Sequence, residues 1–180
     1  MATKTALSSE DNNVTTGQDI ANLISKCSDC TNITEGGNYI TSFMHLPKLK
    51  LPIRSKLAII VNSEKDYSEN VGHWFVLVIY ANKTLILCDG LNETEIKSPS
   101  VMQVVKSFCS INGLTYTSLN VRCQLQTSKT CGFICLFFVA KASLLSLTSF
   151  ILLRNTMTRN SIHTNEEFVI KFVRSHYSKS

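Results

Sequence analysis

The stretch HWFVLVIYANKTLILCDG, residues 73–90, contains two apolar runs, 73–80 and 84–90, joined by the polar segment 81–83. Aliphatic and aromatic residues dominate both runs, which is typical of β-strands. A connection as short as 81–83 predicts an antiparallel hairpin. Because apolar side chains occupy both faces of each strand, we expect the hairpin at the centre of a sheet that is covered on both sides.

The rest of the chain predicts further strands and several helices. KLAIIVN (56–62) and the alternating TYTSLNV (115–121) are typical of strands. Helical spacing or helix-starting residues predict helices from Gly17 to Cys27, from Ser98–Pro99 to near Gly113, from Cys131 onward, and after a capping box of Thr164 and Glu167. The sequence has no internal repeat. We expect a single domain over residues 17–180, preceded by a polar tail of residues 1–16.

The composition is that of a globular protein, since 44% of the 180 residues are hydrophobic, 17% are charged and three are proline. A net charge of +5 is compatible with nucleic-acid binding, although a solvated basic surface explains it as well. Seven cysteines are an odd number for a disulfide framework, and residues 1–16 lack the apolar core of a signal peptide. We therefore expect free thiols in a reducing, intracellular compartment.

Cys27 and Cys30 have the CxxC spacing of many zinc sites. The sequence has no second CxxC and no suitably spaced histidine pair to complete such a site. We therefore expect no metal, and interpret the pair as two thiols in a loop.

Residues 133–153 are apolar enough and long enough to raise the question of a membrane span. Lys141 lies near the middle, where a charge costs about 2.5–3.5 kcal/mol on insertion scales. The predicted sheet also needs a helix to cover it. We therefore expect a buried helix and no stable membrane insertion, the alternative being a membrane-associated accessory protein anchored by 133–153.

Cys131 is predicted to lie at the first turn of this helix. Free N–H groups and the helix dipole stabilise a thiolate there. Gly132 has no side chain, so that a substrate backbone can approach closely. A buried cysteine that acts only as a small apolar residue is the alternative interpretation.

His73 is the histidine best placed to activate such a thiol. His45, His163 and His176 fall in a predicted loop or in the polar C-terminal region. Pairing Tyr80 with Thr84 across 81–83 places Asp89 on the same face of the hairpin as His73, where its carboxylate can orient the imidazole. A loop one residue shorter would turn Asp89 to the opposite face.

Gln124 lies in a polar loop between a predicted strand and Cys131. Its side-chain amide is a candidate donor to a developing oxyanion. Gln126 is a competing candidate in the same loop, and a solvated surface glutamine is the simpler interpretation of either.

The ordered set His73-Trp74, Asp89, Gln124 and Cys131-Gly132 resembles the adenovirus protease (adenain) family. It also resembles the wider clan of cysteine proteases that contains the SUMO-specific proteases. The segments KLAIIVN, VGHWFVLVIY, TLILCDG and QLQTSKTCGFICLFF are similar to the family's strand, His-Trp hairpin, acid and Gln–Cys-Gly segments. The resemblance covers most of the chain from about Gly17.

The resemblance implies an α+β fold, with a central mixed sheet and helices on both sides. It implies a thiol endopeptidase in which Cys131 is the nucleophile, His73 is the general base and acid, and Asp89, in place of the family's glutamate, orients His73. Gln124 and the Cys131 N–H would form the oxyanion hole, and Trp74 would flank the site. The implied substrates are viral capsid or core precursors. The alternative within the clan is an isopeptidase for SUMO or ubiquitin-like modifiers, for which the chain is short.

The family also implies partners and a location. Its members act in the host nucleus and the virion and are activated by viral DNA and by a short peptide held through a disulfide. No cysteine falls at the matching position, because Cys109 and Cys123 lie on either side of it. We expect a monomer that needs no cofactor for its chemistry. The basic segment PKLKLPIRSK (47–56) is the candidate DNA contact, through Lys48, Lys50, Arg54 and Lys56.

Overall fold

The computed structural model describes residues 16–52, 56–64 and 72–178. The predicted tail, residues 1–16, lies outside this part of the chain except for Thr16. The Thr16 hydroxyl accepts a hydrogen bond from the Asp19 N–H, and the Asp19 carboxylate accepts one from the Thr16 N–H. This capping box fixes the start of the first helix.

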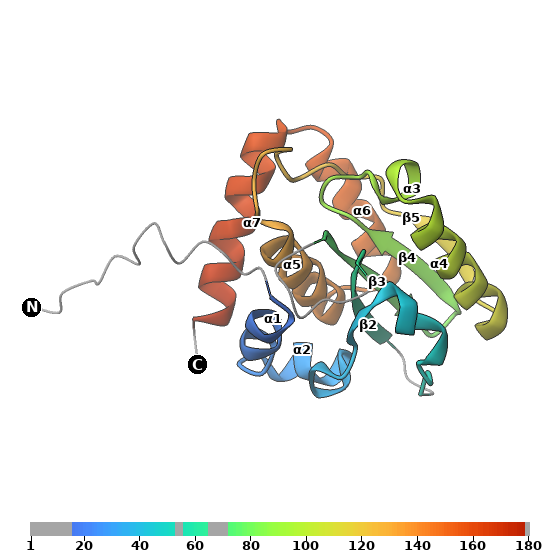
Figure 1. Cartoon of the computed structure of the whole chain (residues 1–180). Coiled ribbons are helices and arrows are strands. Elements are labelled where there is room, and N and C mark those ends of the chain that lie inside the picture. Colours follow the sequence, from blue (N-terminus) through green and yellow to red (C-terminus); the bar gives the residue numbers. More distant parts are fainter. Residues whose placement is uncertain (1–15, 53–55, 65–71, 179–180) are drawn as a thin grey trace, which may run out of the picture.

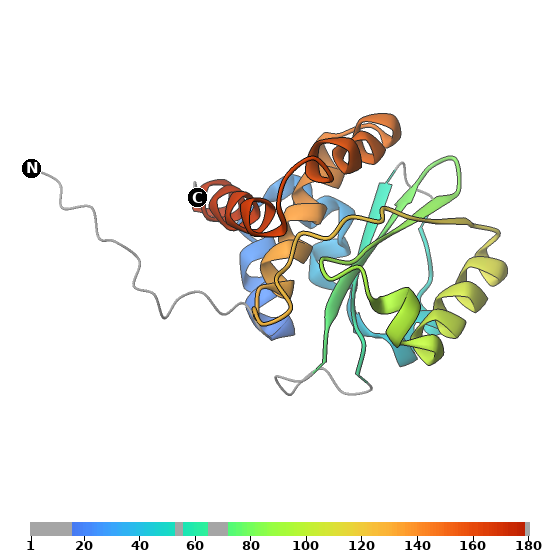
Figure 2. The same ribbon diagram turned by 90° about the horizontal axis from the view of Figure 1, so that it is seen from above.

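Five strands form one mixed sheet in the order β1-β2-β3-β4-β5 (Figures 1 and 2). β1–β2 and β4–β5 pair in parallel, while β2, β3 and β4 pair antiparallel. The predicted hairpin is confirmed, although the strands predicted over 84–90 and 115–121 end earlier. The bounds are β1 Ile40–Ser42, β2 Lys56–Asn62, β3 Trp74–Tyr80, β4 Thr84–Cys88 and β5 Thr115–Ser118.

Helices account for most of the remaining described chain. The predicted helix after Ser98 is confirmed: Pro99 opens it, and Gly113 ends it in the left-handed conformation at φ 62°. The α-helices are α1 Gly17–Ile24, α2 Ser28–Ile33, α3 Thr94–Lys97, α4 Pro99–Asn112, α5 Cys131–Leu144, α6 Leu147–Met157 and α7 Ile162–Tyr177. Two 3₁₀ helices, η2 Glu35–Gly37 and η3 Phe43–Lys48, flank β1.

The sheet is covered on both faces, as its apolar strands predicted. Val76 and Val78 of β3 face a core formed with α5, α1, α2, α6 and α7. Phe75 and Leu77, which alternate with them, face a second core formed with α4 and η3. The fold is therefore α+β, with a central mixed sheet flanked by helices, and α5 lies directly against the sheet (Figures 1 and 2).

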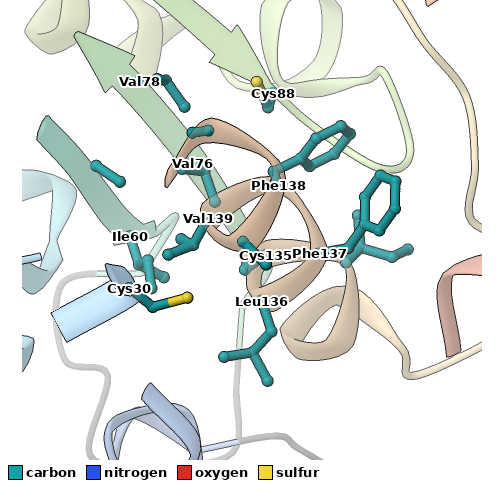
Figure 3. Packing of buried hydrophobic residues seen from close by; sticks show 14 of the residues in the cluster. Cys30, Ile60, Val76, Val78, Cys88, Cys135, Leu136, Phe137, Phe138 and Val139 are labelled. Atoms are coloured by element: carbon teal, nitrogen blue, oxygen red, sulfur yellow. The ribbon is translucent and has the colours of Figure 1, made fainter. Parts of the chain in front are cut away.

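Helix α5 is the buried helix predicted from the sequence. Its residues from Gly132 to Ala140 are all buried, and Figure 3 shows α5 beside the strands that carry Ile60 and Val76. The apolar stretch 133–153 is not one helix, because α5 ends at Leu144 and the Ser146 hydroxyl caps the separate helix α6. Within the described ranges, every helix is too short or too polar to cross a bilayer.

Lys56 of the predicted basic cluster has a structural role. Its ammonium group donates hydrogen bonds to the carbonyl oxygens of Ala142, Ser143 and Leu145 at 3.0, 3.2 and 2.8 Å. These carbonyls lie at the C-terminal end of α5, where a helix favours a cation. Lys56 therefore has acceptors within the protein, which leaves it less available to phosphates, and Arg54 lies outside the described residues.

Two helix boundaries differ from those predicted. Helix α1 ends at Ile24, and Cys27 is the N-cap of a second helix, so that the CxxC pair opens α2 and does not lie in a loop. Helix α7 begins at Ile162, because the Ser161 hydroxyl accepts the Thr164 N–H. The predicted capping box of Thr164 and Glu167 is therefore wrong, since both residues lie inside the helix.

Candidate active site

The β3–β4 hairpin brings His73 and Asp89 together. Its register pairs Val76 with Cys88, so that Asp89 follows β4 on the side of the sheet predicted from the 81–83 loop. The His73 Nε2 atom lies 2.5 Å from Asp89 Oδ1. The side chain of His73 is 21% exposed and that of Asp89 only 3%, so the imidazole remains accessible while the carboxylate is enclosed.

The backbone of His73 is held by hydrogen bonds to Ser63, which directly follows β2. The Ser63 N–H donates to the His73 carbonyl oxygen, and the His73 N–H donates to the Ser63 hydroxyl, both at 2.9 Å. Gly72 has a φ of +86°, and a Cβ atom there would lie 2.4 Å from both Asn62 Oδ1 and Glu64 Cγ. Any other residue at position 72 would displace the side chains of Asn62 and Glu64, so only glycine fits beside His73.

The Asp89 carboxylate accepts several hydrogen bonds besides its contact with His73. Oδ1 accepts the Leu91 N–H at 3.0 Å, and Oδ2 accepts the N–H groups of Glu93 and Thr94 and the Thr94 hydroxyl at 2.8 Å each. Burial disfavours the charged carboxylate, but the hydrogen bonds from His73, Thr94 and Glu93 outweigh it and hold the pKa of Asp89 well below its usual range. Asp89 is therefore a fixed anion that orients the imidazole.

Cys131 is the first residue of α5 and lies against His73 and Trp74. Burial alone would raise the pKa of the Cys131 thiol, but the hydrogen bond with His73 and the backbone N–H groups of Trp74 and Gly132 lower it. Burial likewise opposes the charged form of His73, yet Asp89 and Cys131 raise the pKa of His73 to about 9. These opposite shifts stabilise a thiolate beside an imidazolium. Because Nε2 contacts Asp89, Nδ1 is the ring nitrogen left for the thiol.

The other buried thiols have the opposite electrostatic environment. Burial raises the pKa of Cys30 to about 12 and also raises the pKa of the thiols that pack inside the two cores, which are Cys88, Cys109, Cys123 and Cys135. A lowered pKa combined with partial exposure distinguishes Cys131 from these thiols.

Gln124 is 2% exposed and is held where the loop meets the end of β4. Its backbone N–H donates to the Gly90 carbonyl oxygen at 3.0 Å, and its side-chain Nε2 donates to the Ser128 carbonyl oxygen at 3.1 Å. A Cβ atom on Gly90 would lie 2.9 Å from Ile134 of α5 and 3.2 Å from Gln124 Oε1. The glycine after Asp89 thus allows the glutamine side chain to lie close to α5. Ser128 accepts only one of the two N–H groups of this side-chain amide.

Gln126, the competing glutamine, has a different environment. It is exposed, and its amide contacts Arg122 at 3.0 Å and Glu93 at 3.4 Å. The structure places it on the outer surface of the loop, in polar contacts typical of a solvated side chain. Of the two glutamines, Gln124 alone is buried.

Glu166 of α7 organises the loop before Cys131 and was not predicted from the sequence. It is 5% exposed, accepts the Leu125 N–H at 3.2 Å and the Thr130 hydroxyl at 2.6 Å, and also accepts the Ser128 hydroxyl. The sequence contains a pattern that could have identified it: Glu166 lies three residues before Val169 and therefore on the buried face of α7. A carboxylate in that position requires partners, and the loop provides them.

The CxxC pair has a neighbour that sequence spacing did not indicate. His176 of α7 lies beside Cys27, with 3.4 Å between Nε2 and Sγ. The sequence lacks a suitably spaced histidine pair, as noted above, but the fold brings this single histidine from the opposite end of the chain to the two thiols.

Comparisons with known proteins do not assign the chain to a family: neither the protein-family models nor the curated proteins give a match. The functional argument therefore rests on the geometry of Cys131, His73, Asp89 and Gln124.

Proposed function

We propose that the protein is a cysteine endopeptidase with a site similar to that of the adenain family. The observation that carries the proposal is the Cys131–His73–Asp89 arrangement, in which the pKa of the thiol is lowered and that of the imidazole is raised. A nucleophile, a base and a group that orients the base are the parts that covalent acyl transfer requires.

The reaction follows from these positions. The Cys131 thiolate bonds to the carbonyl carbon of the scissile peptide, and the carbonyl oxygen becomes an anion. The Cys131 backbone N–H, which has no intrahelical acceptor at the first helical position, and the Gln124 amide donate to that anion. The His73 imidazolium gives its proton to the leaving amine, and the acyl-enzyme forms. Neutral His73 then removes a proton from water, which attacks the thioester and releases Cys131.

The proposed substrates are capsid or core precursors of an adenovirus-like virus, cleaved in the nucleus and virion. This part of the proposal is supported by the resemblance alone. A peptide activator bound through a disulfide is not supported, because Cys109 is 5% exposed and Cys123 is fully buried. Neither sulfur is accessible to a peptide on the surface.

DNA stimulation is supported by the remaining described members of the basic cluster. Lys48 and Lys50 are both exposed near the start of the segment that leads to β2. Electrostatic contacts to phosphates are independent of sequence and weaken steeply with salt. Cleavage measured with random DNA should therefore rise at low salt, and the rise should be smaller in a Lys48→Ala, Lys50→Ala variant. A matched variant of exposed lysines elsewhere, Lys106→Ala with Lys171→Ala, should keep the full rise.

The chemistry is tested by competitive alkylation of the folded protein with iodoacetamide and mass spectrometry of each cysteine peptide. Cys131 should react first, and His73→Ala should slow its labelling toward that of an ordinary thiol. Labelling of Cys131 no faster than of the other thiols, or unaffected by His73→Ala, would reject the assignment. Profiling against capsid-derived peptides and modifier–fluorophore conjugates then separates an endopeptidase from an isopeptidase.

A further inference from the structure

Two cysteines and one histidine converge at a second place, away from the proposed catalytic residues. Cys27 caps the N-terminus of α2, Cys30 lies in its first turn, and His176 lies in the last turn of α7. The two sulfurs are 2.7 Å apart, Cys27 Sγ is 3.4 Å from His176 Nε2, and all three ligand atoms lie within 4.8 Å of one another. Helices from opposite ends of the chain thus meet through groups that commonly bind metals.

The surrounding contacts hold these groups in place. The His176 ring stacks on Phe172 with 5.3 Å between ring centroids and 13° between ring planes, which fixes the plane of the imidazole. The Tyr177 hydroxyl lies 3.2 Å from Cys30 Sγ and donates to the Leu136 carbonyl oxygen of α5 at 3.1 Å. Figure 3 shows the Cys30 sulfur directed toward α5, on the side of Leu136. The site is therefore backed by α5 and partly open at Cys27 and His176.

We propose that Cys27, Cys30 and His176 bind a divalent metal ion of the zinc class, with water in the fourth tetrahedral position. Two thiolates neutralise a divalent cation, which suits a half-buried place, and an imidazole completes a borderline-soft ligand set. This site is independent of the proposed protease chemistry, because it shares no ligand with it.

The spacing of the three groups is close to what such an ion requires, since all three ligand atoms lie within 4.8 Å of one another. Tetrahedral ligands at zinc bond lengths lie about 3.6 Å apart for sulfur and nitrogen and about 3.8 Å apart for two sulfurs. The observed 3.4 Å between Cys27 Sγ and His176 Nε2 is already close to the first value. The two sulfurs must separate by about 1 Å, and Cys27 can turn because its side chain is only partly buried.

The same two sulfurs are also close enough to form a disulfide if an oxidant is present, which is the competing interpretation. His176 has no role in a disulfide, whereas its position beside Cys27 is what a metal site requires. The position of His176 therefore favours a metal site over a disulfide.

The experiment uses the full-length protein, reduced and freed of metal by a chelator, and then titrated with Co²⁺. Binding through two thiolates and one imidazole should give the absorption bands of tetrahedral Co²⁺ and of thiolate-to-cobalt charge transfer. Both bands should saturate near one equivalent of Co²⁺ and disappear when Zn²⁺ is added. Cys27→Ser, Cys30→Ser and His176→Ala should each weaken binding at least about tenfold. Zn²⁺ at one hundred times its Kd should raise the melting temperature by about 5–10 °C in the parent protein only.

Matched controls separate this site from the catalytic one, where a thiol and an imidazole also meet. Cys131→Ser removes the catalytic thiol, and His163→Ala removes an exposed histidine of the same helix α7. Both should keep the cobalt spectrum. The proposal fails if the spectrum is lost in Cys131→Ser but kept in Cys27→Ser, or if no tetrahedral spectrum forms. It also fails if reduced Cys27 and Cys30 form a disulfide in air equally fast with and without Zn²⁺.

Discussion

Replacing Asp89 with asparagine tests how the carboxylate controls the thiol. The Asp89 Oδ2 atom accepts the N–H groups of Glu93 and Thr94, so an asparagine at this position will direct its carbonyl oxygen toward them. Its NH₂ group then faces His73 and donates to Nε2. A neutral imidazole in that tautomer carries its proton on Nδ1, toward Cys131, and cannot accept a proton there.

The size of the effect follows from the hydrogen bond that is lost. A hydrogen bond to a charged group contributes about 1.5–3 kcal/mol, which corresponds to about a ten- to hundredfold change in the population of the imidazolium–thiolate pair. We therefore expect kcat/KM at neutral pH to fall by about two powers of ten in Asp89→Asn, with a smaller loss in Thr94→Val, which removes a single hydroxyl donor to the same carboxylate.

The assay is the rate of Cys131 alkylation as a function of pH. In the parent protein the lowered pKa of Cys131 keeps the thiolate reactive at pH values below the ordinary thiol range. In Asp89→Asn the pKa of His73 falls from about 9, the imidazolium is lost, and alkylation should rise only as pH approaches 9. An Asp89→Asn profile that superimposes on the parent profile would refute the proposed role of the carboxylate.

Three further predictions concern the surroundings of the site. Gln124→Ala should lower turnover by roughly two to three powers of ten while leaving alkylation of the thiol intact, and Gln126→Ala should do little; equal losses would mean that the loop had been damaged. Glu166→Ala should reduce the free energy of unfolding by about 2–4 kcal/mol in urea titrations, because it leaves loop donors without an acceptor, whereas the exposed neighbour Glu167→Ala should change it by less than about 0.5 kcal/mol. Gly72→Ala should lower both activity and melting temperature through strain at φ +86°, and unchanged values would show that the turn adjusts freely.

The hairpin and its two site residues were predictable because local rules determine them. Strand propensity and the short 81–83 loop define the register, and the register alone places Asp89 on the side of His73. Cys131 was predictable for a similar reason, since the N-terminus of a buried helix is visible in sequence. In each case the interacting residues belong to one hairpin or one helix end.

The groups that sequence did not predict interact across long distances in the chain. His176 meets Cys27 across most of the sequence, and Glu166 binds a loop that lies before α5. Lys56 was assigned to a charged surface, although it caps the end of α5. Composition describes the type of such side chains but not their partners, because the partners depend on how helices pack on the sheet.

Helix α7 carries both Glu166 and His176. The distance between these two residues allows the proposed protease and the proposed metal site to be tested independently. Glu166 binds the loop before Cys131, while His176 lies in the last turn of the helix beside the CxxC pair. Ten residues of α-helix separate them by about 15 Å, so the ligands of the proposed metal do not contact the loop that carries Gln124. Cys27→Ser should therefore remove cobalt binding without changing the alkylation of Cys131, whereas Glu166→Ala should lower turnover and keep the cobalt spectrum.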